Sequence, residues 1–289
     1  MTAPAVSVVI PTRDRAEQLV RCVGAIAAAA RPAGGVEVVV VNDGGAPLAG
    51  EALAAVGDGL AIRLLDQPSG GPAAARNRGA AAASGALFAF TDDDCEPAPG
   101  WLEALEQRLD RDPDVRVAGR AASLHPDNDF ATACQLLTDH LHRWYNRDPE
   151  HGSFATSNNL ALRADTFHAL GGFDASFPTA AAEDREFAER ALRAGHRVVF
   201  EPGAVVGHRH RLTARAFLRQ HYGYGRGARR VLRVRRRAGG GMFVEPPAFY
   251  TQMLRSPWSE HRGPRAARLA LLLAASQAAH TAGLVREGF

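Results

Sequence analysis

The chain has 289 residues, of which 46% are hydrophobic and 22% charged, and its formal net charge is +3. This length and apolar content can build one large or two small domains with a substantial core, which excludes a chain disordered throughout. So small a net charge gives the whole chain no general attraction to polyanions, and nucleic acid is not an expected partner.

The first half alternates strand-like and helix-like stretches, the pattern of βαβ units that build a mainly parallel sheet. Apolar, largely β-branched runs predict strands at residues 6–10, 36–41, 62–65 and 86–90. Helix-like stretches follow at residues 16–30 and 73–83. Open α/β sheets bind ligands at the carboxyl ends of their strands, and three polar segments stand there. They are residues 11–14, 42–45 and 92–94.

Beyond about residue 112 the alternation lapses, and we expect a lid and substrate region. Further strands are predicted at residues 115–118 and 198–200, and further helices at 183–195 and 266–283. The Arg and Gly triplets at 235–237 and 239–241 predict a flexible junction.

Cysteine usage and the lack of a signal-like segment favour the cytoplasm. The three cysteines, Cys22, Cys95 and Cys134, are widely spaced and lack the paired spacing of a zinc site. Polar residues interrupt the apolar run at 269–275 before it reaches the length of a membrane span. Peripheral contact at the inner face of the membrane stays open as an alternative.

Asp92, Asp93 and Asp94 are the most informative feature. Three carboxylates repel one another unless a cation or a donor compensates them, and Mg²⁺ or Mn²⁺ accepts such ligands. An acidic turn that caps the next helix is the alternative.

The ordered set of motifs resembles the inverting family 2 glycosyltransferases of GT-A fold. Five segments carry the resemblance besides the Asp triplet. They are residues 6–15, 41–45, 71–79, 158–161 with 171–174, and 183–186. The resemblance covers roughly residues 5–230.

The resemblance implies a mixed, mainly parallel, Rossmann-like α/β sheet flanked by helices, with a helical C-terminal extension. We expect the glycosyltransferase domain at 1–230, divided into a nucleotide-binding half at 1–112 and an acceptor and catalytic half at 113–230. Residues 231–289 then form the linker and the extension.

The resemblance also assigns a donor site for a nucleotide-sugar. Asp94 is implied as the metal ligand on the diphosphate, with His208 as a second ligand to Mn²⁺ or Mg²⁺. A surface histidine in a basic loop is the alternative for His208. The other residues implied at the donor are Pro11, Thr12, Asp14, Asp43, Arg76, Asp92 and Asp93. The alternative role for Asp14 is that of a helix N-cap, and the alternative for Asp43 is that of a turn residue.

By the same resemblance Asp184 is the general base that deprotonates the acceptor hydroxyl, with Glu183 in support. The alternative is that Glu183 and Asp184 only begin an exposed helix, since acidic side chains are stabilised at the positive, N-terminal end of the helix dipole. Ala182 stands where many relatives carry Gly.

From His208 to Arg237 the chain has eleven Arg and no Asp or Glu. Arg219 or Arg226 could contact the diphosphate, and the segment could contact anionic lipid or form a solvated face.

We therefore expect a metal-dependent inverting glycosyltransferase that uses a UDP-sugar, with GDP and dTDP not excluded. The acceptor is open among a glycan, a lipid carrier, a natural product and a protein, and a homodimer is open too. A sugar-phosphate nucleotidyltransferase and a non-catalytic sugar-nucleotide-binding protein are the alternatives.

Overall fold

The computed structural model describes residues 4–29, 34–177, 182–237, 239 and 244–286. The chain folds into two compact units. Unit 1 comprises Met1–Ala122, Asp148–Thr179 and Glu183–Arg209, and unit 2 comprises Ser123–Arg147, Ala180–Ala182 and His210–Phe289.

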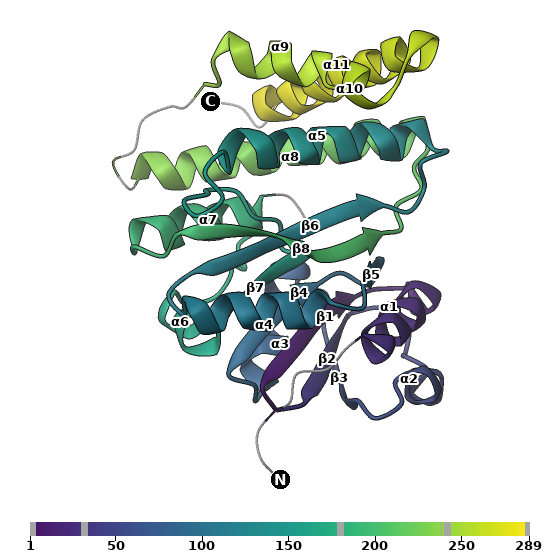
Figure 1. The fold of residues 1–289 in the computed structure, drawn as a ribbon, viewed down its shortest axis with the longest axis vertical. Helices are drawn as coiled ribbons and strands as arrows, with labels where there is room; N and C mark the ends of the chain where they lie inside the picture. The colour runs from purple at the N-terminus through teal and green to yellow at the C-terminus, as the bar shows by residue number, and fades with distance from the viewer. Residues whose placement is uncertain (1–3, 30–33, 178–181, 238, 240–243, 287–289) are drawn as a thin grey trace. The chain divides into compact units, whose positions relative to one another are not determined.

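Unit 1 contains the sheet and the helices that cover it (Figure 1). Its strands are β1 (Val6–Thr12), β2 (Val36–Asp43), β3 (Ala61–Gln67), β4 (Leu87–Thr91), β5 (Cys95–Pro97), β6 (Arg116–Ser123), β7 (Asn159–Arg163) and β8 (Val198–His208). Its helices are α1 (Ala16–Ala28), α2 (Gly50–Val56), α3 (Pro72–Ala82), α4 (Trp101–Arg111), α6 (Ala164–Ala169) and α7 (Glu183–Arg193).

The eight strands form one mixed sheet in the order β3-β2-β1-β4-β7-β6-β8-β5. The first four are parallel, whereas β4 with β7, β7 with β6, and β5 with β8 pair antiparallel. The chain runs outwards from β1 through β2 to β3 and then returns to place β4 on the other side of β1. The carboxyl ends of β1 and β4 are therefore neighbours at a switch point, where such sheets bind ligands.

The sheet is buried on both faces, which explains the continuous apolar runs of its central strands. Val8 and Ile10 pack in one core cluster with residues of α1 and α4. Val9, between them in sequence, packs in the other cluster with α3 and a group of phenylalanines. The two clusters follow from the alternation of side chains along a strand.

Unit 2 is helical. It contains α5 (Asp129–Tyr145), α8 (Ala214–Arg237), α9 (Pro247–Arg255), α10 (Pro257–Glu260) and α11 (Gly263–Arg286). Asn128 caps α5, because its side chain accepts a hydrogen bond from the Ala131 N–H at 2.8 Å. Helices α5, α8, α9 and α11 contribute to one apolar cluster. Within the described part of the chain, no helix is both long and apolar enough to cross a bilayer.

Helices α8 and α11 pack backbone to backbone through two glycines. A Cβ at Gly225 would collide with the His280 carbonyl, and one at Gly283 would collide with the Tyr222 carbonyl. Only glycine permits so close an approach at these two positions.

The predicted α/β fold with a helical C-terminal extension is confirmed. The strand predicted at 198–200 continues through the apolar residues 204–206 to form the long β8. The predicted flexible junction covers residues 235–237 and 239–241. Residues 235–237 instead belong to α8, and residues 240–241 lie outside the described residues. The compact units do not divide at residues 112 and 230, so the functional division there stays a prediction.

Gly225→Ala should destabilise the chain by about 1–3 kcal/mol, because the added methyl group forces α8 and α11 apart. Gly223→Ala is the matched control on the same helix, since nothing lies within 4 Å of its new Cβ. That control should be neutral or stabilising by up to about 1 kcal/mol. Chemical denaturation measures both variants, and equal stabilities would contradict the close approach.

Candidate active site

The acidic triplet forms the turn between β4 and β5, beside the carboxyl end of β1. The turn is held by the Cys95 N–H, which donates to the Asp92 carbonyl at 3.0 Å. Each of the three carboxylates has a partner of its own, and Arg15 in addition contacts both Asp93 and Asp94.

Asp92 is paired with a buried arginine that also contacts the catalytic motif. Arg76 Nη2 donates to Asp92 Oδ1 at 2.6 Å, and its Nη1 donates to Glu183 Oε1 at 3.0 Å. Arg76 is only 2% exposed and lies on α3, whereas Glu183 begins α7. One guanidinium group thus joins the turn after β4 to the start of α7, although Arg76 and Glu183 are 107 positions apart in the sequence.

Asp93 points back towards β1. Its carboxylate accepts from Thr12 Oγ1 at 2.7 Å and from Arg15 Nη1 at 3.1 Å. Burial raises the pKa of Asp93 to about 6, although Arg15 and Thr12 oppose this and favour the charged form. Asp93 therefore connects the triplet to β1 and is only 3% exposed.

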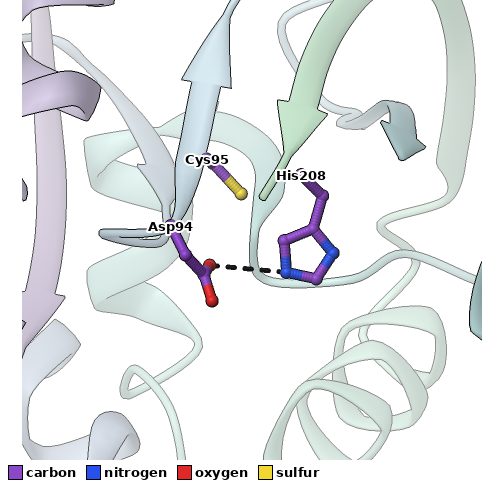
Figure 2. Close-up of side chains that lie close together, drawn as sticks. All are labelled: Asp94, Cys95 and His208. Carbon is purple, nitrogen blue, oxygen red and sulfur yellow. Dashed lines mark ion pairs between the residues drawn. The ribbon is translucent and has the colours of Figure 1, made fainter. Parts of the chain in front are cut away.

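Asp94 faces His208, as Figure 2 shows. The antiparallel pairing of β5 with β8 sets Cys95 opposite His208, and the Arg209 N–H donates to the Asp94 carbonyl at 2.8 Å. His208 Nε2 lies 3.4 Å from Asp94 Oδ1. Burial disfavours the charged imidazole, but the hydrogen bond and the negative charge of Asp94 outweigh it and raise the pKa of His208.

The donor atoms of Asp94 and His208 fit a Mn²⁺ or Mg²⁺ ion better than a thiophilic metal. The Cys95 sulfur also lies within 4.8 Å of both donor atoms. However, Cys95 is fully buried, and burial raises the pKa of its thiol well above the ordinary value. A protonated thiol is a poor ligand, and a hard cation prefers oxygen. A carboxylate and an imidazole remain, and Mn²⁺ accepts both.

The residues predicted at the nucleotide base lie at the ends of β1 and β2 and in the loop after β1. Asp43 accepts from Gln67 Nε2 at 2.8 Å and from the Gly70 and Gly71 N–H groups at 2.7 and 2.9 Å. It therefore fixes the loop that leads into α3. A carboxylate offers about four acceptor positions, so one position remains for a ligand.

Asp14 is exposed and has a left-handed backbone with φ 55°, a conformation in which Asp and Asn are enriched. Its carboxylate accepts from the Ala46 N–H at 2.9 Å and so joins the loops after β1 and β2. The N-cap of α1 is Arg15, and no side chain caps that helix end. Pro11 is part of β1 and pairs in register with Val41 of β2.

Asp184, the predicted base, lies in the first turn of α7 and is half-buried. Burial raises its pKa to about 7, and the neighbouring Glu183 adds repulsion. The N–H groups of Arg185 and Ser157 and the charge of Arg76 only partly offset this. The carboxylate is thereby tuned to accept a proton near neutral pH.

The residue before the motif is strained. Ala182 has φ 71°, a left-handed conformation that glycine adopts at far lower cost. This is the position where the sequence shows Ala in place of Gly.

Arg15 and Asn159 lie in the motif segments, but the sequence alone assigns neither of them a role at the site. Arg15 Nη1 contacts both Asp93 and Asp94, and its place after the polar segment at the end of β1 is a signal that could have identified it. Asn159 is fully buried behind the triplet. It accepts from the Trp101 indole N–H at 2.8 Å and donates to the Arg120 and Ala204 carbonyls.

Arg219 and Arg226, named from the sequence as possible contacts of the diphosphate, are on α8 in unit 2. A role for them at the donor stays a prediction.

Comparison with known proteins gives a consistent assignment. The model of "Glycosyl transferase family 2" matches residues 7–170, and that of "Glycosyl transferase family group 2" matches residues 124–279. The pre-mycofactocin glycosyltransferase of Mycobacterium tuberculosis is 35% identical over 227 residues, which are 76% of this chain and 46% of that protein. Glycosyltransferase AglE of Haloferax volcanii is 27% identical over 271 residues, 88% of this chain and 86% of that protein. The chain thus spans about half the length of the mycobacterial relative.

Solved structures show the same fold. The mannosyltransferase PcManGT from Pyrobaculum calidifontis, in complex with GDP-Man and Mn²⁺, has a TM-score of 0.67 at 19% identity. That match covers 99% of this chain and 88% of the other. TarS of S. aureus in complex with UDP-GlcNAc has a TM-score of 0.57 at 17% identity. The match covers 95% of this chain and 72% of the TarS chain. With the fold, the ordered motifs and the family model in agreement, the chain belongs to glycosyl transferase family 2.

Proposed function

We propose that this chain is an inverting glycosyltransferase that moves a sugar from a nucleotide-diphosphate donor to an acceptor hydroxyl. The observation that carries the proposal is the bridge made by Arg76, which contacts Asp92 on the donor side and Glu183 on the catalytic side. A transferase needs the leaving diphosphate and the base next to one another, and this arrangement supports both positions.

The donor would lie at the carboxyl ends of β1, β2 and β4. Asp94 and His208 would hold the divalent ion, which when bound neutralises charge on the leaving diphosphate. Arg15 contacts Asp93 and Asp94 and is half-exposed, so its guanidinium group could turn towards a phosphate oxygen. Thr12 orients Asp93 by donating to it.

The nucleotide base would lie beside Asp43, whose carboxylate already shapes the loop at Gly70 and Gly71. We propose a UDP-sugar as the first donor to test. The complexes of the structural neighbours contain GDP-Man in one case and UDP-GlcNAc in another, so GDP-sugars belong in the same panel.

Asp184 would act as the general base. The acceptor hydroxyl gives its proton to the Asp184 carboxylate while its oxygen bonds to the anomeric carbon. The bond from that carbon to the phosphate oxygen breaks, and the nucleoside diphosphate leaves with the electron pair. Attack opposite to the leaving group inverts the anomeric configuration. Glu183 stays paired with Arg76 and keeps the start of α7 in place.

The acceptor class to test first is a small natural product. Two relatives are named for such molecules, a pre-mycofactocin glycosyltransferase and a validoxylamine A glucosyltransferase. Glycans, lipid carriers and proteins follow in the same screen. We place the reaction in the cytoplasm, in keeping with the three cysteines, which are all free.

Asp94→Ala should weaken Mn²⁺-dependent binding of a nucleotide-sugar by more than about tenfold, because a ligand on the diphosphate side is lost. Calorimetry with a donor panel, with and without Mn²⁺, measures this. Asp165→Ala is the matched control, since its side chain is 73% exposed on α6.

Three outcomes, the first from calorimetry and the other two from assays of the reaction products, would count against the proposal. Binding unaffected by Asp94→Ala would remove the metal assignment. Release of pyrophosphate instead of nucleoside diphosphate would identify a nucleotidyltransferase. Donor binding without turnover on any acceptor would favour a binding protein.

Transfer should require ionised Asp184. Because burial raises its pKa to about 7, kcat should rise with pH through neutrality and level off above it. Asp184→Asn should lower kcat by about 10²–10⁴-fold and remove the rise of kcat with pH, while the Kd for the donor changes little. A pH profile of the variant identical to that of the wild type would exclude Asp184 as the base.

Arg76→Met should lower the free energy of unfolding by about 3–5 kcal/mol, because buried Glu183 loses its ion pair with Arg76. Arg78→Met, at an exposed position on the same helix, should change it by no more than about 0.5 kcal/mol. Adding Glu183→Gln to Arg76→Met should restore part of the loss, because it removes the buried charge that Arg76 compensated. Equal stability of Arg76→Met and Arg78→Met, measured by urea denaturation, would contradict the bridge.

A further inference from the structure

The net charge of +3 conceals a strong separation of charge between the two units. Unit 1 contains 17 Arg against 25 Asp and Glu, whereas unit 2 contains 17 Arg against six. A helical unit with so large a positive excess creates a field that favours an anionic partner.

The charge on α8 is concentrated along one face. Five exposed arginines follow one another at intervals of four, seven, seven and three residues, which at 3.6 residues per turn place them on one stripe. This arginine stripe consists of Arg215, Arg219, Arg226, Arg233 and Arg236. It extends over about 32 Å of a 24-residue helix.

The rest of the helix keeps this stripe outward. Phe217 and Val231 are buried on the opposite side, and Gly225 brings α8 into backbone contact with α11. The stripe is therefore held by tertiary packing, with little freedom to turn inward.

Such a stripe costs stability in isolation. Like charges three and four residues apart on a helix repel one another, as in Arg215 and Arg219, and the segment from His208 to Arg237 itself contains no acidic residue. An extended anionic surface would remove this repulsion, and arginine binds phosphate groups through paired donors.

Exposed apolar side chains in unit 2 favour a lipid surface over a nucleic acid as the anionic partner of the stripe. Among the described residues nine large hydrophobic side chains are exposed, and eight of them lie in unit 2. Leu218 stands beside the stripe, one turn after Arg215, and Trp258 is 53% exposed on α10. Arginine with an exposed leucine beside it on α8 is typical of a helix that lies in a membrane interface, and Trp258 is an exposed aromatic side chain elsewhere in the same unit.

We propose that the arginine stripe of α8 docks unit 2 onto a bilayer that contains anionic phospholipids. The guanidinium groups contact lipid phosphates, and Leu218 inserts among the head groups. The stripe belongs to unit 2 and the acidic triplet to unit 1, and vesicle binding is measured without donor or acceptor, so the test of membrane docking does not depend on the proposed transfer reaction.

Vesicle co-sedimentation tests the proposal. The full chain should bind phosphatidylcholine vesicles that contain about one third phosphatidylglycerol and should lose this binding at high salt, where surface charges are screened. Pure phosphatidylcholine vesicles should bind far less of it. The triple variant Arg219→Glu, Arg226→Glu, Arg233→Glu should lower the partition coefficient by more than about tenfold.

A matched triple variant controls for net charge. Arg78→Glu, Arg111→Glu and Arg193→Glu change the same charge at exposed positions of unit 1 and should leave vesicle binding within about twofold of the wild type. Circular dichroism checks the fold of both variants, and an Arg→Gln version of the α8 triple replaces the Glu version if that one fails to fold.

Three results would overturn the proposal. In one, the wild type does not bind anionic vesicles at low salt. In another, the α8 triple variant binds as well as the unit 1 control. In the third, double-stranded DNA competes fully with the vesicles and binds more tightly than they do, which would make the stripe a nucleic-acid surface.

Discussion

The candidate site depends on the compensation of carboxylates gathered at one edge of the sheet. Asp92, Asp93 and Asp94 would repel one another and the acidic start of α7 if no cation stood among them. Arg76 carries most of this compensation, because it is buried and contacts both Asp92 and Glu183. Arg15 and His208 compensate the remaining two members of the triplet. One result is that the donor-side and catalytic motifs, far apart in sequence, lie within reach of a single side chain.

The strand order explains why these groups meet at all. The return of β4 to the free side of β1 puts the triplet beside Thr12, and the antiparallel β5–β8 pair adds His208 to the same edge. The buried side chain of Asn159 stabilises this part of the sheet through hydrogen bonds to Trp101, Arg120 and Ala204. A donor site built on strand ends is more rigid than one on free loops, which suits a reaction that requires close positioning of two substrates.

The two units differ in charge as well as in secondary structure. The sheet-containing unit is acidic and bears the proposed donor and base residues, whereas the helical unit is basic and contains most of the large apolar side chains that are exposed among the described residues. In the proposed enzyme, chemistry and surface attachment would therefore be assigned to separate parts of the chain. This division is invisible in the net charge, because the two contributions nearly cancel.

The sequence by itself determined the α/β class, the strands that end at polar segments, the helical C-terminal extension and the family resemblance. These rest on local periodicity and on ordered motifs, which need no long-range information. Only the tertiary structure decided where each carboxylate points. Asp93 turned to Thr12 and Arg15, Asp43 to its own loop, and Arg76 to Glu183. Spacing along the chain cannot supply such pairs, because they form between residues dozens of positions apart, where burial makes an unpaired charge costly and selects its partner.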